Sequence, residues 1–395
     1  MPHSLILAIE SSCDETSAAV VRNGSQVLSN VVASQLIHSS YGGVVPELAA
    51  REHLRAIVPV VRQAMQRAGV TYSQLAAVAV TEGPGLAGAL LVGISFAKSL
   101  AFGASLPLIA VNHLEGHIHA VLMQNCFQQD ASPLLALVVS GGHTHLYLAT
   151  LTRRLAGSTW SYRNVGKTLD DAAGEACDKV AKLLGLPYPG GPWIDALATY
   201  GQADRDLFPL ARIKQKLSGR TAPKLARESV AALDQKRFDM SFSGLKTAVR
   251  RYVELRQMQP AIQTRQQALQ SINLHRARPD TANMARALPH FDAQTLNLIA
   301  SFQSSVVDNL TRATFSAARH YGVRGVLVTG GVAANSHLRK VFLGKAQRAE
   351  LPIAFPEVAL STDNAAMIAA AAWPKLLASE FAADNLEPAP QLRLG

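Results

Sequence analysis

The stretch Leu5-Ile6-Leu7-Ala8-Ile9 is the first of three β-prone runs that together decide the fold. The second and third runs cover residues 18–21 and 27–32, and Asn23-Gly24 lies between them. Asn-Gly between two such runs is the strongest short signal for a β-hairpin. The sequence therefore predicts an N-terminal meander of three strands.

The same order of elements occurs twice along the chain. After the first meander, helix and strand patterns alternate over residues 46–68, 76–80, 86–102 and 108–111. A second meander and a second alternation follow, at residues 134–139, 145–151, 159–163, 172–184, 325–328, a helix after Asn335, 352–355 and 363–377. This duplicated pattern predicts two α/β domains with mixed sheets and a cleft between them.

We expect the boundary between these domains near residue 132. The first domain then covers residues 1–132 and the second covers residues 133–362, while a last helix at about 363–379 packs back on the first domain. Residues 205–300 break the pattern, because they are basic and rich in Gln and Ala. We interpret them as an insertion in the second domain.

Composition excludes several classes of protein. Hydrophobic residues make up 48% of the 395 residues, which suits two or three cored domains and excludes a disordered chain. The longest apolar stretch, residues 86–97, contains glycines and is shorter than the ~18 residues that a membrane helix needs. Three scattered cysteines (Cys13, Cys126 and Cys177) do not form a disulfide scaffold, and the N-terminus lacks the pattern of a signal peptide. We therefore expect a cytoplasmic protein without a membrane segment.

The positive charge of the chain is concentrated in one window. Between Arg205 and Arg286 there are 17 Lys and Arg residues against 6 Asp and Glu, although the whole chain has a net charge of only +10. A localised field of this kind suits a polyanion. A solubilising insertion explains the same composition equally well.

The sharpest local motif is His113-Leu114-Glu115-Gly116-His117. On a helix, positions i and i+4 share a face, so both imidazoles can bind one metal ion. Two capping or half-buried histidines are the alternative, and for this spacing alone they are the more common case. A zinc protease is disfavoured, because its motif needs a glutamate at i+1, where Leu114 stands.

Two glycine-rich loops follow predicted strands. They are Ser140-Gly141-Gly142 and Gly330-Gly331, the second of which leads to Asn335. Glycine lets backbone N–H groups approach oxyanions, and the start of a following helix favours negative charge. Because ligands of α/β sheets bind where strands end, we interpret the pair as phosphate or nucleotide loops.

Carboxylates lie near these loops in the sequence. Asp14 and Glu15 follow the first predicted strand, while Asp170 and Asp363 stand at predicted helix starts. For the latter two, local rules favour N-capping over catalysis, because Asp commonly caps helices.

Ten motifs in a fixed order give the chain a resemblance to one family. They are Glu10-Ser-Ser-Cys-Asp-Glu-Thr16, Tyr41-Gly-Gly-Val-Val-Pro-Glu-Leu-Ala49, Gly83-Pro-Gly-Leu86, His113-Leu-Glu-Gly-His117, Val139-Ser-Gly-Gly-His-Thr144, Asp170-Asp-Ala-Ala-Gly-Glu175, Tyr188-Pro-Gly-Gly-Pro192, Ser241-Phe-Ser-Gly-Leu-Lys-Thr247, Gly330-Gly-Val-Ala-Ala-Asn335 and Ser361-Thr-Asp-Asn364. Over roughly residues 5–250 and 300–375, the chain resembles the TsaD (YgjD/Gcp) family of tRNA N6-adenosine threonylcarbamoyltransferases, bacterial type.

The resemblance implies an α/β, two-domain actin-like and sugar-kinase-like (ASKHA) fold, in agreement with the duplicated pattern. It also implies transfer of a threonylcarbamoyl group from threonylcarbamoyl-AMP to N6 of the adenosine 3′ to the anticodon, in tRNAs that read codons beginning with A. The adenylate has a good leaving group, whereas the adenine amine is a poor nucleophile that a proton-accepting carboxylate activates. The competing function is an actin-like ATPase, which turns over ATP without tRNA.

The matching motifs also imply site residues. His113, His117 and Asp363 correspond to metal ligands, and Asp14 and Glu15 to an acidic catalytic loop in which the general base stays open. The adenylate is expected to contact strand-end loops and helix starts, at Val138, Val139, Ser140, Gly141, Gly142, Asp178, Gly191, Asp195, Gly330, Gly331 and Asn335.

The resemblance further implies a cofactor and partners. One divalent metal ion is expected; two His and one Asp suit iron or zinc, of which we favour iron. Archaeal and eukaryotic relatives have a tyrosine ligand where Val138 stands, so we expect a more open coordination here. The expected partners are tRNA, a TsaB-type paralogue and a TsaE-type ATPase, with a homodimer as the alternative when the chain acts alone.

Overall fold

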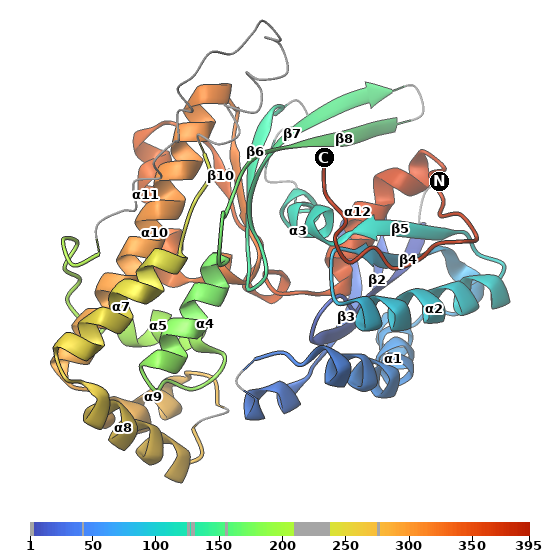
Figure 1. Ribbon diagram of the computed structural model, residues 1–395. Coiled ribbons are helices and arrows are strands. Elements are labelled where there is room, and N and C mark those ends of the chain that lie inside the picture. Colours follow the sequence, from blue (N-terminus) through green and yellow to red (C-terminus); the bar gives the residue numbers. More distant parts are fainter. Residues whose placement is uncertain are drawn as a thin grey trace, which may run out of the picture.

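The computed structural model describes residues 4–41, 43–124, 127, 131–154, 157–208, 238–274 and 277–395. Two five-stranded mixed sheets organise this part of the chain (Figure 1). Residues 209–237, which hold much of the predicted basic insertion, lie outside the described residues, as does Cys126. None of the described helices is both long enough and apolar enough to cross a membrane.

The first sheet has the strand order β3-β2-β1-β4-β5. Its strands are β1 (Leu5–Glu10), β2 (Glu15–Arg22), β3 (Gln26–Ser34), β4 (Leu75–Gly83) and β5 (Leu108–Asn112). The first three pair antiparallel, whereas β4 is parallel to β1 and β5 is parallel to β4. Asn23 and Gly24 have φ angles of 52° and 69°, the left-handed backbone that Asn-Gly hairpin turns adopt. The predicted first meander is present.

The second sheet repeats this topology with the strand order β10-β9-β6-β7-β8. Its strands are β6 (Leu134–Val139), β7 (Thr144–Arg154), β8 (Gly157–Lys167), β9 (Val326–Thr329) and β10 (Ile353–Ala354). Again three strands form an antiparallel meander, and two further strands add in parallel. The predicted duplication of a mixed sheet is therefore confirmed.

Helices cover both faces of the first sheet. They are α1 (Pro46–Ala68), α2 (Ala87–Gly103), α3 (His113–Leu122) and α12 (Ala365–Leu377). Leu5, Leu7 and Ile9 of β1 pack in one cluster with α1 and α2, while Ile6 and Ala8 pack in another with α12. This alternation follows from the two-residue period of a strand.

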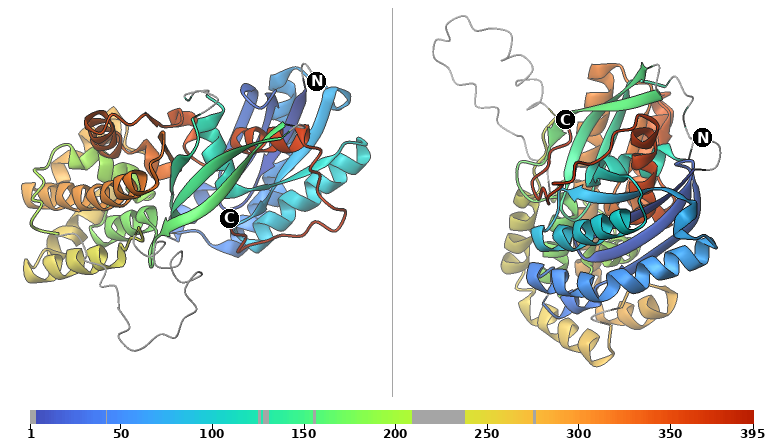
Figure 2. Two further views of the ribbon diagram at one scale, coloured as in Figure 1. Left: turned by 90° about the horizontal axis from the view of Figure 1, so that it is seen from above. Right: turned by 90° about the vertical axis from the view of Figure 1, so that its right-hand side faces the viewer.

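The last helix therefore lies on the first sheet, although it follows the second sheet in the sequence (Figure 1). The long β7–β8 hairpin reaches across to it from the second sheet (Figure 2). The position of the domain boundary near residue 132 stays a prediction.

The second half is mostly helical around its sheet. Its helices are α4 (Ala173–Leu183), α5 (Gly190–Ala198), α7 (Ser243–Leu255), α8 (Gln259–Ser271), α9 (Thr281–Ala287), α10 (Ala293–Tyr321) and α11 (Ser336–Arg348). Short 3₁₀ turns occupy Leu36–Ser40, Tyr72–Gln74, Leu288–His290, Gly331–Ala334 and Val358–Leu360.

Part of the basic window is built into the core of the second half. Arg265 of α8 is only 2% exposed. Its guanidinium donates to the Leu184 carbonyl and to Thr295 Oγ1, each at 2.8 Å, and stacks over the Phe291 ring. A buried cation is tolerated only when its donors are satisfied in this way. The described part of the insertion is therefore an integral layer of the fold.

Two helix starts differ from the local expectation. Asn364, not Asp363, caps α12, with its side chain accepting a hydrogen bond from Met367 N at 3.1 Å. Asp170 does not cap α4; it accepts from the backbone of Phe242 and Ser243 at the start of α7. Asp363 and Asp170 were predicted to cap the helices that follow them, and this prediction is wrong for both. Each carboxylate instead interacts with residues far away in the sequence.

Candidate functional site

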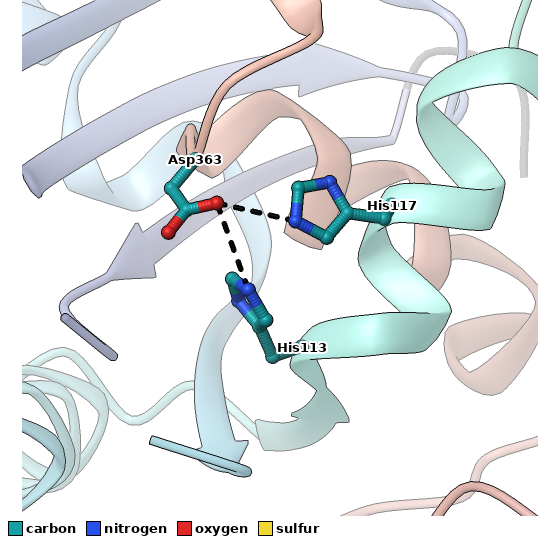
Figure 3. A group of neighbouring side chains, drawn as sticks. All are labelled: His113, His117 and Asp363. Atoms are coloured by element: carbon teal, nitrogen blue, oxygen red, sulfur yellow. Dashed lines mark ion pairs between the residues drawn. The ribbon is translucent and has the colours of Figure 1, made fainter. Parts of the chain in front are cut away.

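Three potential metal ligands from distant parts of the chain meet at one point (Figure 3). His113 and His117 lie one turn apart on α3, and Asp363 lies in the loop before α12. Asp363 Oδ1 is 3.1 Å from His117 Nε2 and 3.6 Å from His113 Nε2. One ligand atom of each residue lies within 4.8 Å of those of the others. Such a group is a candidate site for a metal ion.

The environment of His117 fits a metal ion. The residue is fully buried, Nδ1 makes no hydrogen bond with any described residue, and Nε2 faces Asp363 Oδ1 at 3.1 Å without hydrogen-bond geometry. An unsatisfied buried nitrogen is costly, whereas a metal bond would satisfy it. Burial alone would raise the pKa of Asp363, but the facing imidazoles of His113 and His117 hold it well below its usual value. The carboxylate is therefore ionised, as a ligand must be.

Glu10, at the end of β1, supports the first histidine from behind. It is fully buried, and its Oε2 lies 3.1 Å from His113 Nδ1. Thr81 Oγ1 donates to the same oxygen at 2.6 Å, and Ser12 N donates to Oε1. A carboxylate on Nδ1 fixes the tautomer and orientation of a ligating imidazole, and leaves Nε2 for the ion. Sequence reasoning placed Glu10 in a motif but assigned it no role. Its position at the end of an apolar strand could have indicated a buried, functional carboxylate.

The acidic loop at Asp14 and Glu15 joins β1 to β2. His53 of α1 holds this loop, with Nε2 2.9 Å from the Cys13 carbonyl and Nδ1 2.8 Å from Thr16 Oγ1. Burial, followed by the charges of Asp14 and Asp363, raises the pKa of Glu15 well above its usual value. The loop and the candidate metal ligands therefore share one electrostatic environment.

The same loop also faces the second half of the chain. Burial is the largest cause of a raised pKa at Asp178 and at Tyr188, and the charge of Asp14 adds to it in both cases. From the second sheet, His143 places its ring 6.2 Å from the ring of His113. The two halves thus meet between the acidic loop and the strand-end loops. Sequence reasoning did not single out His143 as a site residue.

Four of the glycines that were predicted to contact the adenylate face open space. A Cβ atom added at Gly141, Gly142, Gly191 or Gly331 would have no neighbour within 4 Å. By contrast, Gly330 has φ 96°, and a Cβ there would lie 2.4 Å from the Val139 carbonyl. Gly330 therefore lets β9 end close against β6, while the other four leave backbone accessible to a ligand.

Side chains at the predicted nucleotide site hold these loops in place. Asp178 accepts from Gly190 N at 2.8 Å and from Gly191 N at 3.3 Å. Asp195 accepts from Ser336 N at 2.8 Å, and Asn335 caps α11 by accepting from Leu338 N at 2.8 Å. The structure therefore connects α4, α5 and the start of α11 around the ends of the second sheet.

The remaining predicted residues lie at the end of β6. Val138 and Val139 are fully buried, and Val138 packs in a cluster with Leu114 and Ile118 of α3. Ser140 closes the loop, because its backbone N donates to the His143 carbonyl at 2.8 Å. The valine side chains therefore shape the site without facing a ligand, and only the loop beyond them is open.

Two other features lie apart from this group. Glu115 turns away from the histidine pair and forms an ion pair with Lys375 of α12 at 3.1 Å. A pocket of about 720 Å³ lies between the C-terminal ends of α10 and α11, beside Phe315 and Arg319, and none of the predicted site residues lines it.

Comparison with known proteins gives one consistent result. Residues 26–370 match the family TsaD, described as tRNA N6-adenosine threonylcarbamoyltransferase. The protein of that name from Koribacter versatilis is 55% identical over 100% of both chains. The one from Halalkalibacterium halodurans is 45% identical, over 99% of this chain and 96% of the relative.

Among solved structures, HypF from T. kodakarensis is similar in fold, with a TM-score of 0.53 at 11% identity. The likeness covers 96% of this chain and 49% of HypF. Together with the duplicated mixed sheets, it confirms the predicted two-domain actin-like, sugar-kinase-like fold.

Proposed function

The chain belongs to the TsaD family of tRNA N6-adenosine threonylcarbamoyltransferases, and from this we infer how its site carries out a transfer to tRNA. The enzyme transfers a threonylcarbamoyl group from threonylcarbamoyl-AMP to N6 of the adenosine 3′ to the anticodon, in tRNAs that read codons beginning with A. The observation that carries this proposal is the meeting of the two halves, where the His143 ring lies 6.2 Å from the His113 ring. A mixed anhydride held there has its phosphate side at the glycine loops and its acyl side at the three ligands.

His113, His117 and Asp363 would hold one divalent metal ion. Iron is our preferred assignment and zinc the alternative, since two imidazoles and a carboxylate suit either. When bound, the ion supplies a Lewis acid that polarises an oxygen of the acyl phosphate. Val138 is buried among apolar side chains and would offer no further ligand.

The glycine loops are proposed to bind the adenylate. No side chain fills the space beside Gly141, Gly142 and Gly331, so the adenylate can approach the backbone there. Oxyanions bind well to N–H groups at loop and helix starts. The N–H of Gly191 already donates to Asp178, so Gly191 offers open space but no free donor. Asp178 and Asp195 serve to hold this surface in shape, because their oxygens already accept backbone hydrogen bonds.

Asp14 is proposed as the group that takes the proton from the adenosine amine. The N6 amine is a poor nucleophile, and a positioned base typically contributes roughly 10²–10⁴-fold in rate. Burial, followed by the charges of Asp14 and Asp363, raises the pKa of Glu15, so Glu15 holds a proton more readily than an ordinary carboxyl group. We therefore assign the role of base to Asp14, the neighbouring carboxyl group of the loop.

The exposed basic side chains of α7 are proposed to contact tRNA phosphates. Arg250 and Arg251 are exposed on this helix, and Arg256 is exposed at its end. Asp170 fixes the start of the helix by accepting from Ser243 N at 3.2 Å, and the same carboxylate accepts from the hydroxyl groups of Ser241 and Ser243. The helix is therefore anchored to the segment that leads from β8 into α4.

Protein partners are proposed as a TsaB-type paralogue and a TsaE-type ATPase, in the cytoplasm where tRNA is modified. Apolar side chains on α1 and α2 support a protein contact there: Leu54 is 66% exposed, Leu91 53% and Phe102 90%. Exposed apolar surface of this kind commonly marks an interface. A homodimer of this chain is the alternative occupant.

A reconstituted assay tests the proposed function. Labelled threonine, bicarbonate, ATP, an adenylate synthase, the two proposed protein partners and tRNA are incubated with wild type, Asp14→Ala or His113→Ala. The proposal predicts modified nucleoside with wild type and a large loss with either variant. Equal yields in all three reactions would refute the assignment of the site.

A further inference from the structure

The segment after α12 runs back along the first half of the chain as an ordered strap, which we define as residues 382–394. Ala382 N donates to the Leu108 carbonyl at 2.8 Å, and Ala389 N donates to the Glu82 carbonyl at 2.9 Å. Figure 1 shows this dark red trace passing along β5 and ending beside β8. The strap therefore crosses from one half of the molecule to the other.

The middle of the strap is packed against the loop that follows β4. A Cβ atom at Gly83 would lie 1.9 Å from the Ala389 carbonyl oxygen, so this close approach requires glycine. Gly85 N donates to the Pro390 carbonyl at 3.2 Å. On its other side, Gly85 lies against Ser12, whose backbone N donates to Glu10 behind His113. The strap thus contacts the loop after β4, and this loop contacts Ser12, which is bonded to Glu10 beside His113.

The end of the strap reaches the first turn of α3. Asn112 caps this helix, because its Oδ1 accepts from Leu114 N at 2.9 Å. The same side chain donates through Nδ2 to the Arg393 carbonyl at 3.4 Å. The side-chain amide of Asn112, the residue before His113, therefore bonds both to the start of α3 and to the strap.

Leu394 anchors the strap between the two halves. Its side chain is 8% exposed and belongs to a cluster that contains Leu114 and Ile118 of α3. Tyr147 of β7 belongs to the same cluster, with Tyr162 of β8 packed against it. A single apolar side chain thus joins a cluster shared by the histidine helix and the second sheet.

We propose that the strap is a positioning element of the active site, which holds the start of α3, and with it His113 and His117, against both sheets. Without the strap, α3 would still be joined to the first sheet by its own cap, but its orientation toward the second sheet would depend on fewer packed groups. The predicted effect of the strap on metal binding rests on the proposed metal site. The predicted effect on the position of α3 rests only on the packing described above.

The test uses the full chain with Leu394→Asp, which removes the anchor, and Leu394→Ala, a milder change in case the first variant does not fold. Leu394→Met preserves an apolar side chain of similar volume. Gln391→Asp, at an exposed position of the same strap, introduces the same charge without touching the anchor. Two properties are measured in each protein: hydrogen exchange of the α3 amides, and Co²⁺ binding by its dissociation constant and visible spectrum.

For Leu394→Asp and Leu394→Ala, we expect faster exchange in α3 and Co²⁺ binding weakened by about tenfold or more, the effect typical of removing a group that orients the metal ligands. The Co²⁺ spectrum should change as well, whereas Leu394→Met and Gln391→Asp should match wild type. Folded anchor variants with unchanged α3 exchange and unchanged Co²⁺ binding would overturn the proposal. If wild type and His117→Ala bind Co²⁺ alike, the metal assignment fails instead, and exchange in α3 alone decides the role of the strap.

Discussion

Asp363 Oδ1 lies 3.1 Å from His117 Nε2, so the loop before α12 meets α3. This approach exists because α12 returns from the second sheet to pack on the first. The ligand set is therefore complete only when α12 is packed on the first sheet beside α3. Metal binding and the docking of α12 are coupled by this geometry.

Replacing Glu10 by Gln tests the support behind His113. The amide keeps the volume of the side chain but removes the charge that fixes the imidazole, so we expect metal affinity to fall by about 10–100-fold. Competition with a chelator measures the dissociation constant. Glu47→Gln, at an exposed residue of α1, is the matched control and should bind as wild type. Equal affinity in both variants would show that Glu10 has no such role.

Replacing Gly142 by Ala should weaken ligand binding without changing the stability of the fold. A Cβ there has no neighbour within 4 Å, so we expect the thermal midpoint to stay unchanged. The methyl group would occupy space proposed for the adenylate, and affinity for AMP should fall by roughly tenfold, the equivalent of one charge-assisted hydrogen bond. Calorimetric titration with AMP gives the value. Gly103→Ala, also in open space but at the end of α2, serves as control, and identical AMP binding by both variants would contradict the loop assignment.

Charge reversal at Arg250, Arg251 and Arg256 tests the tRNA surface on α7. We expect weaker tRNA binding and a flatter dependence on salt, by about 0.9 in the slope of log K against log salt for each phosphate that the protein no longer neutralises. Filter binding at several salt concentrations provides both quantities. Reversal of three exposed arginines of α1, Arg55, Arg62 and Arg67, controls for the same change in net charge. The proposal is wrong if the two sets of variants behave alike.

A buried histidine makes stability depend on pH. Burial, helped by the charge of Lys375, lowers the pKa of His119 to about 3 in the folded chain. Between the ordinary histidine pKa of about 6.5 and that value, the unfolded chain binds a proton here that the folded chain does not. Stability is therefore lost as pH falls through this window, by up to about 1.4 kcal/mol per pH unit from this residue.

Urea unfolding of wild type and His119→Gln between about pH 6.5 and 4.5, inside this window, measures the effect. Glutamine retains a hydrogen-bonding group for Tyr162, whose hydroxyl lies 3.0 Å from His119 Nε2. We expect the free energy of unfolding of the variant to fall less steeply with acid than that of wild type. Parallel curves would mean that His119 is protonated alike in both states.

The elements that sequence alone predicted well are those set by local pattern. The runs at residues 5–9 and 18–21 and the Asn23-Gly24 turn have the two-residue period and backbone preference of a hairpin, which neighbours along the chain determine. The spacing of His113 and His117 likewise places both rings on one helix face without tertiary information.

The residues that sequence reasoning missed act through partners far along the chain. Glu10 matters because β1 ends beside α3, His53 because α1 packs behind the acidic loop, and His143 because the two halves meet. Asp363 looked like a helix cap, since Asp is a good cap and a helix follows. The neighbouring Asn364 takes that role and leaves the carboxylate free to face the histidines.

The most direct test of the central claim is anomalous diffraction from crystals of the metal-loaded full chain, at the absorption edges of iron and zinc. We expect a single strong peak within about 2.0–2.2 Å of a nitrogen of His113, a nitrogen of His117 and an oxygen of Asp363. A peak bound to other residues, or none at this position in protein that contains stoichiometric metal, would contradict this claim.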